Sequence, residues 1–156
     1  MSDMKIRLSE EQRALVGTVR DLARSKFRDR TGKWQDGTFP WENLRELAQI
    51  GVLGMSVPEE YGGSGLPVFD TALVLEEVSK VCYVTAMALR GEVGVQVRVI
   101  STYAPEHMKR DILPKVVSGD ALLAVCMTEP HAGTDVANYR TNTTIKGDRA
   151  YVKGVK

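Results

Sequence analysis

The segment LLAVCMTEPHAGTDVA at 122–137 holds residue types that could do chemistry, because it joins an apolar run to a loop rich in hydroxyl groups. The residue before a proline is held extended and proline donates no N–H, so the Glu-Pro pair at 129–130 should leave main-chain N–H groups unpaired where a strand ends. Gly133 would let the backbone pass close to a bulky partner, and Thr128 and Thr134 offer hydroxyls that donate or accept. Such a loop could bind a flat heteroaromatic ring and an adjacent phosphate. A plain transition from strand to loop explains the same residues equally well.

The other candidates for chemistry carry weaker signals. His107 and His131 are the only histidines, and no acidic or cysteine cluster surrounds them at ligand spacing, so we expect ordinary surface or loop residues and no metal site. Cys126 lies inside the apolar run, where a thiol is usually an inert, buried small hydrophobe. The glycines of 62–65 form neither G-x-G-x-x-G nor a P-loop and predict a tight loop with positive backbone angles.

The composition limits the class of protein. A chain of 156 residues has room for one domain, or for one domain and part of another. Its 21 basic and 20 acidic residues give a net charge of +1, which creates no field that would attract nucleic acid or an anionic membrane. No run approaches the roughly 20 apolar residues of a membrane span, and Cys82 and Cys126 suggest no disulfide framework. We therefore expect a soluble, cytoplasmic protein with no nucleic-acid partner and no membrane insertion.

Apolar residues recur at helical spacing through most of the first 120 residues. Proline and glycine at suitable positions bound these segments, as Gly51 does where a left-handed cap would end the second helix. The predicted helices cover residues 9–30, 41–50, 70–81, 84–103 and 105–119.

Four residues give these helices particular features. Ser9, with Gln12 three positions later, predicts a capping box at the start of the first helix. Asp70 is a suitable N-cap for the third. The segment 84–103 should be a helix that is either buried by others or broken near Gly91, and Pro114 should kink or divide the last helix.

The character of the sequence changes at residue 121. The run ALLAVCM at 121–127 has strand length, and 139–156 alternates loosely around the turn dipeptide Gly147-Asp148, which predicts two further strands joined as a hairpin. Three short strands ending in an unpaired edge make an unfinished sheet. The predicted fold is mainly α with a short β portion: an all-helical domain at 1–120 followed by an incomplete β-domain at 121–156.

Three segments resemble, in order, the acyl-CoA dehydrogenase family of flavoproteins. VPEEYGGSG at 57–65 is similar to that family's loop between the second and third helices, and LPKVVSGD at 113–120 to its link into the middle domain. MTEPHAGTD at 127–135 is similar to its flavin-binding signature. The resemblance covers nearly the whole chain, which itself covers less than half of a typical member. It implies the family's N-terminal helical domain followed by the beginning of its middle β-domain.

The resemblance also implies binding residues for FAD. The main chain at Met127 and the Thr128 hydroxyl would meet the flavin ring, and Gly133 and Thr134 the phosphates. Thr134, which stands where the family usually has Ser, would also touch the acyl-CoA thioester. His131 stands where a small residue is common. The complete set implied for the cofactor is Val125, Cys126, Met127, Thr128, Gly133 and Thr134.

The reaction implied is α,β-dehydrogenation of an acyl-CoA in fatty acid metabolism: a carboxylate removes the α-proton while a hydride passes to the flavin, which hands its electrons to an electron-transfer flavoprotein or a similar acceptor. The family's catalytic Glu lies in a C-terminal bundle that these residues lack, and Glu129 is no substitute. No catalytic residue is therefore assigned, and the isolated chain is expected to be inactive. The resemblance further implies a homo-oligomer.

Two alternatives stay open at this point. An acyl-CoA oxidase or flavin monooxygenase of the same fold would let dioxygen reach the reduced flavin. A non-enzymatic helical interaction module could keep the motifs as scaffold and bind a partner through its unpaired strand edge.

Overall fold

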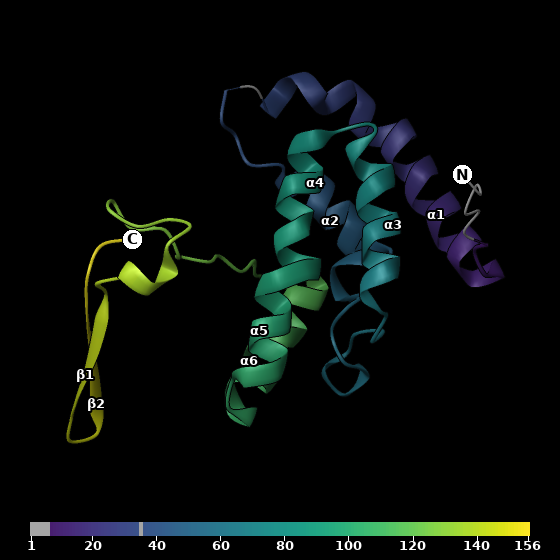
Figure 1. Cartoon of the computed structure of the whole chain (residues 1–156). Coiled ribbons are helices and arrows are strands. Elements are labelled where there is room, and N and C mark those ends of the chain that lie inside the picture. Colours follow the sequence, from purple (N-terminus) through teal and green to yellow (C-terminus); the bar gives the residue numbers. More distant parts are fainter. Residues whose placement is uncertain (1–6, 35) are drawn as a thin grey trace, which may run out of the picture. The chain divides into compact units, whose positions relative to one another are not determined.

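The structure is a computed structural model that describes residues 7–34 and 36–156. It divides into two compact units (Figure 1), a helical unit up to Leu123 and a C-terminal unit from Ala124 to Lys156. The predicted fold class, mainly helical with a short β portion, is confirmed. No helix among the described residues is both long enough and apolar enough to cross a membrane.

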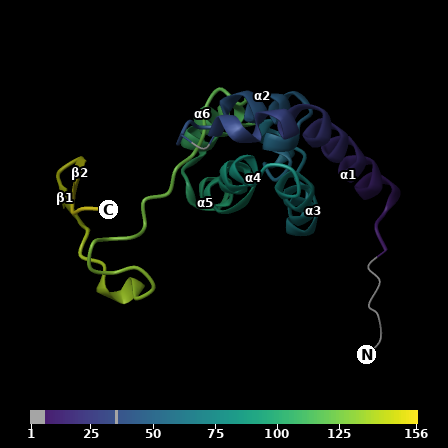
Figure 2. The same ribbon diagram turned by 90° about the horizontal axis from the view of Figure 1, so that it is seen from above.

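The described part of the helical unit contains six α-helices, close to the predicted segments. Figure 2 shows α1, α2 and α6 on one side of this unit and α3, α4 and α5 on the other. A π-helical turn at Ala23–Phe27 and a 3-10 segment at Arg28–Trp34 continue α1, and shorter 3-10 turns lie at Val52–Gly54 and Glu59–Tyr61. The helices are α1 Glu10–Leu22, α2 Trp41–Gln49, α3 Val68–Ser79, α4 Tyr83–Arg90, α5 Gln96–Tyr103 and α6 Glu106–Ser118.

The capping box at the start of α1 is confirmed. The Ser9 hydroxyl accepts the Gln12 N–H at 3.1 Å, and the Gln12 side chain accepts the Ser9 N–H at 3.0 Å. The assignment of Asp70 as an N-cap is wrong, because α3 already begins at Val68, directly after Pro67. Proline suits a helix start, where its missing N–H costs nothing. Asp70 instead lies buried in the first turn and accepts the Gln12 side-chain N–H at 2.7 Å, which ties α3 to α1.

The glycine and proline signals had different outcomes. Gly51 has φ +79° and takes the predicted left-handed conformation after α2. Of the two alternatives for 84–103, the structure shows the break near Gly91, since a π-helical turn at Gly91–Val95 with a non-helical residue at Gly94 separates α4 from α5. Pro114, however, does not divide α6, which stays one helix. The carbonyl that loses its partner belongs to Arg110, an exposed residue, so water can take the place of the missing N–H.

Two apolar clusters hold the helical unit together. The first joins α1, α2, α3 and α4 around side chains such as Phe27, Leu44 and Val74. The second comprises Val57, Tyr61, Val97, Leu113 and Val116. Every buried residue in both clusters lies before residue 117, and the partly buried ones extend to Leu122 and Leu123.

The loop at 57–65 is tight, as its glycines predict. Gly62 and Gly65 have positive φ. Gly63 is required for a different reason: a Cβ at this position would lie 2.0 Å from the carbonyl oxygen of Val57. The Gly65 N–H donates to that same oxygen at 2.8 Å, so the loop folds back on itself with no room for a side chain.

The C-terminal unit contains the predicted hairpin. Strands β1 (Asn142–Lys146) and β2 (Arg149–Lys153) are antiparallel on either side of Gly147-Asp148, and both are exposed along their length. The predicted first strand at 121–127 is wrong, because these residues form no strand in the described structure. A strand needs a neighbour for its ladder, and the described sheet contains only β1 and β2. Cys126, expected to be buried in that strand, is exposed.

Candidate functional site

The loop Val125–Thr134 contains every residue that the sequence assigns to a binding site. The side chains of Val125 and Met127 are exposed by 53% and 50%. Cys126, Thr128 and the segment 133–134 are exposed as well. The C-terminal unit therefore presents these positions to solvent instead of using them in a core.

A tight turn gives the loop its shape. The Glu129 N–H donates to the Ala132 carbonyl at 2.9 Å, and the Ala132 N–H donates to the Glu129 carbonyl at 3.2 Å. Pro130 stands second in this four-residue turn, a position that its fixed φ favours. Glu129 and Ala132 are buried while the turn's middle residues are exposed. The first and last residues of the turn, Glu129 and Ala132, are therefore the ones that face the interior of the unit.

Glu129 is the anchor of this loop. Its carboxylate accepts the main-chain N–H groups of Arg140 at 2.7 Å and Thr141 at 3.0 Å, and it pairs with the Lys156 ammonium at 3.0 Å. These donors, the Arg140 N–H above all, hold the pKa of the carboxyl well below its usual range. A carboxylate bound in this way is a weak proton acceptor. Its role is to organise the loop.

Lys156 fixes both sides of the loop. Its ammonium donates to the Met127 carbonyl at 2.9 Å and lies 4.1 Å from the ring centre of Tyr139. The Tyr139 hydroxyl in turn donates to the Gly133 carbonyl at 3.2 Å. These contacts were not found from the sequence, because nothing near Lys156 marks it as a partner of residues almost thirty positions away.

The turn brings Thr128 and Gly133 side by side. A Cβ built on Gly133 would meet only the Thr128 methyl group, at 3.9 Å, which is ordinary van der Waals contact. Gly133 also has no positive φ. The unit's own fold therefore does not require glycine here, which suits a position kept open for something outside the loop.

His131, the departure noted from the sequence, lies beside the anchor. Its Nε2 is 3.3 Å from the Glu129 carboxylate and 3.2 Å from the Asn138 carbonyl. Across residues 7–34 and 36–156, no group of three or more His, Cys, Asp or Glu is arranged to hold a metal ion.

The exposed groups of the loop fit the FAD that the sequence implies. Thr128, the segment 133–134 and residues 124–127 are exposed to solvent. Of the nearest carboxylates, Glu129 is buried and pairs with Lys156, whereas Asp135 is exposed and accepts the Asn138 side-chain N–H. Hydroxyls and peptide groups of this kind suit a flavin edge and a pyrophosphate.

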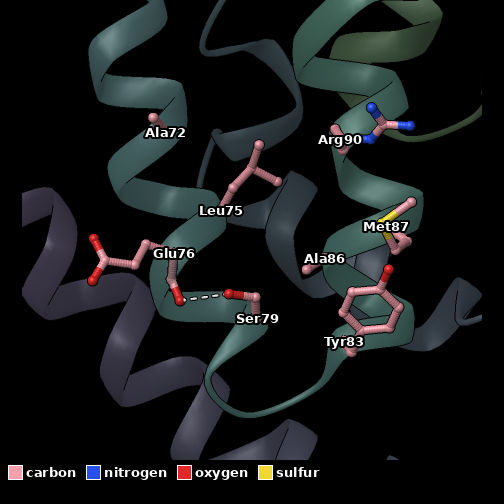
Figure 3. A pocket seen from close by; sticks show the side chains of 8 residues that line it. All are labelled: Ala72, Leu75, Glu76, Ser79, Tyr83, Ala86, Met87 and Arg90. Atoms are coloured by element: carbon pink, nitrogen blue, oxygen red, sulfur yellow. Dashed lines mark hydrogen bonds between the residues drawn. The ribbon is translucent and has the colours of Figure 1, made fainter.

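A separate groove of about 330 Å³ lies between α3 and α4 in the helical unit (Figure 3). Its lining is largely apolar, with Leu75 on α3 and Tyr83 and Met87 on α4. The polar groups on α3 are engaged: Glu76 pairs with Lys80 at 2.8 Å, and the Ser79 hydroxyl donates to the Glu76 carbonyl at 2.9 Å. No residue singled out for chemistry from the sequence lines this groove.

Comparison with known proteins agrees with the fold and the loop. Residues 9–120 match the family model described as acyl-CoA dehydrogenase, N-terminal domain. The 3-sulfinopropanoyl-CoA desulfinase of Cupriavidus necator is 36% identical over 155 residues, covering 96% of this chain and 38% of the relative.

Two solved structures show the same similarity. A Bacillus anthracis acyl-CoA dehydrogenase complexed with FAD has a TM-score of 0.85 and 27% identity, over 94% of this chain and 26% of that one. A structure described as the electron transferring flavoprotein of Acidaminococcus fermentans has a TM-score of 0.85 and 30% identity, over 97% of this chain and 40% of that one.

The fold is therefore that of a flavoprotein dehydrogenase's helical N-terminal region, followed by a short β segment. The chain belongs to the acyl-CoA dehydrogenase family, as its three motifs indicate. It spans about two fifths of the length of the curated relatives that it matches.

Proposed function

We propose that this chain is the FAD-binding N-terminal portion of an enzyme that catalyses α,β-dehydrogenation of an acyl-CoA thioester. The observation that carries the proposal is the geometry of the loop, in which Thr128 and Gly133 stand together on an exposed face while Glu129 is buried behind them. In this proposal residues 1–120 are the helical domain and 121–156 begin the middle β-domain.

The loop residues bind and orient the cofactor. Met127 would meet the flavin ring through its main chain and Thr128 through its hydroxyl, with Val125 and Cys126 leading into the site. Gly133 and Thr134 would take the phosphates, and Thr134 would also contact the acyl-CoA. FAD, when bound, supplies the acceptor for a hydride.

The proposal assigns no proton-abstracting base to this chain. Glu129 is held as a paired carboxylate by main-chain N–H groups and Lys156, which makes it unsuited to that role. The base must come from residues outside the chain. The proposed electron acceptor is an electron-transfer flavoprotein or a similar carrier. The proposed assembly is a homo-oligomer, and the proposed location is the cytoplasm.

A second candidate reaction is favoured by one of the relatives. The Cupriavidus necator protein is a desulfinase of 3-sulfinopropanoyl-CoA, so the same N-terminal region serves a different reaction on a CoA thioester there. This chain could belong to such an enzyme. Which of these reactions the enzyme catalyses depends on the residues that complete the active site. The same holds for the alternatives of an oxidase and a monooxygenase.

The test is to combine the chain with a polypeptide supplying the remaining part of a relative such as that desulfinase. We expect a yellow complex with stoichiometric FAD, and no turnover by the isolated chain with any acyl-CoA and an artificial electron acceptor. Changing Gly133→Leu and Thr134→Leu together should abolish the colour, because both side chains would occupy the exposed face.

The matched control is Thr31→Leu with Gly32→Leu, an exposed Thr-Gly pair in the helical unit whose glycine has open space around it. This variant should keep its FAD. Retained FAD in the Gly133/Thr134 variant would remove the loop from the flavin site. Turnover by the isolated chain would show that the base lies within it, and a colourless complex of normal mass would favour the interaction module.

A further inference from the structure

Glu92 is a buried carboxyl group at the break between α4 and α5. It lies in the π-helical turn Gly91–Val95, through which α4 runs on into α5 in Figure 1. Only 3% of Glu92 is exposed, and the neighbouring Leu89 and Val93 are fully buried. An ionisable side chain on an inward helix face is costly unless it meets a hydrogen-bond partner.

That partner is the main chain of Leu123. The Leu123 N–H donates to the two carboxyl oxygens of Glu92 at 3.0 and 3.1 Å. Leu123 belongs to the run expected to be a strand, which forms no ladder here. In the part of the chain that the structure describes, Leu123 is the one residue from 122 to 128 whose N–H has a hydrogen-bond acceptor. Glu92 therefore takes the place of a neighbouring strand at this point.

The bond lies at the end of the helical unit. Leu122 packs against the first apolar cluster and Leu123 against the second, and Leu123 is the unit's last residue. Val125, the first of the proposed flavin-binding residues, follows two positions later. Whatever fixes the main chain at Leu123 therefore fixes where that segment starts.

We propose that Glu92 is a positioning residue for the flavin-binding segment, holding the Leu123 main chain and with it the starting point of 125–128. The proposal rests on the proposed function, in which that segment binds FAD. Glu92 touches neither flavin nor substrate in this role. Glutamine at this position keeps an oxygen that can accept the Leu123 N–H, whereas leucine has none.

The first measurement uses the whole 156-residue chain without flavin. Amide hydrogen exchange by NMR should show Leu123 protected, with protection about 10-fold lower in Glu92→Leu, as expected for one lost hydrogen bond, and largely restored in Glu92→Gln. The matched control is Thr85→Val, which alters a buried polar group on α4 whose hydroxyl accepts the Asn43 side-chain N–H. Thr85→Val should leave the protection of the Leu123 amide unchanged relative to that of neighbouring amides. Equal protection in wild type and Glu92→Leu would overturn the proposal.

The second measurement follows FAD binding and the visible spectrum in the complex with the remaining part of a relative. Glu92→Leu should raise the dissociation constant of FAD about 10-fold and shift the flavin absorbance bands, while Glu92→Gln and Thr85→Val stay close to wild type. Wild-type binding and spectrum in Glu92→Leu, beside a yellow wild-type complex, would overturn the positioning role and leave the proposed function standing. A wild-type complex that binds no FAD would overturn the proposed function, and the positioning role with it.

Discussion

Glu77 and Glu92 are both buried, yet their pKa values move in opposite directions because their partners differ. Glu77 on α3 accepts two N–H groups of Arg20 on α1, at 2.8 and 3.0 Å, and this lowers the pKa of Glu77 to about 2. Glu92 accepts the main-chain N–H of Leu123, and its burial raises the pKa to about 7. The stability that each contributes therefore changes in a separate pH range.

Glu92 should make the chain less stable as the pH rises from about 4.5 to about 7. The pKa of Glu92 in the folded chain lies above its ordinary value, so folding favours the protonated carboxyl group. The stability that Glu92 contributes is therefore fully present below pH 4.5 and is lost as the pH rises through about 7. The expected loss is about 3 kcal/mol. Urea unfolding of wild type and Glu92→Gln across this range measures it.

The free energy of unfolding of Glu92→Gln should not fall with pH over this range, whereas that of the control Glu76→Gln, at an exposed position, should fall as in wild type. Glu77 does not interfere, because its own contribution is lost only as the pH falls from its ordinary value of 4.5 towards about 2. Parallel curves for wild type and Glu92→Gln would mean that Glu92 titrates normally in the folded chain.

Sequence reasoning at the residue scale identified what the loop offers but not what shapes it. Thr128 and Gly133 stand out by residue type, and the structure places them together. The ion pair between Glu129 and Lys156 was not predicted, because it forms only in the folded unit. The sequence contained a weak signal for Glu92, because its helical spacing from the apolar Leu89 predicts a carboxyl group on the buried face of the helix.

At the scale of elements, helices were predictable because their hydrogen bonds and periodicity are local. The capping box at Ser9, the cap at Gly51 and the break at Gly91 all follow from neighbouring residues. The strand at 121–127 was wrong because a ladder depends on a neighbour that a local pattern cannot reveal. Asp70 shows the same limit, since its partner Gln12 is 58 positions away.

The loop at 57–65 offers a test of packing at this scale. Gly63→Ala should destabilise the helical unit by about 2–3 kcal/mol, because the added Cβ would overlap the Val57 carbonyl oxygen and force the backbone to move. Urea unfolding followed by circular dichroism measures the change. The control is Gly32→Ala, where the new methyl group meets open space. Equal stability of the two variants would mean that the loop is looser than the structure describes.

At the scale of the whole molecule, the helical unit should fold without the C-terminal unit. All the side chains of both apolar clusters come from residues up to Leu123, including the partly buried ones. The Glu92 bond to Leu123 also lies within this part. A chain ending at residue 124 should therefore keep the helical circular dichroism of the full chain, with one cooperative urea transition and a free energy of unfolding within about 0.5 kcal/mol.

The reciprocal fragment, residues 124–156, should show no cooperative transition. Its two strands are exposed on both faces, and a two-stranded hairpin is at best marginally stable in water. Loss of cooperativity in the chain ending at residue 124 would show that the later residues stabilise the helical unit. The residues that match the family model, 9–120, therefore all lie in the unit that builds its own core.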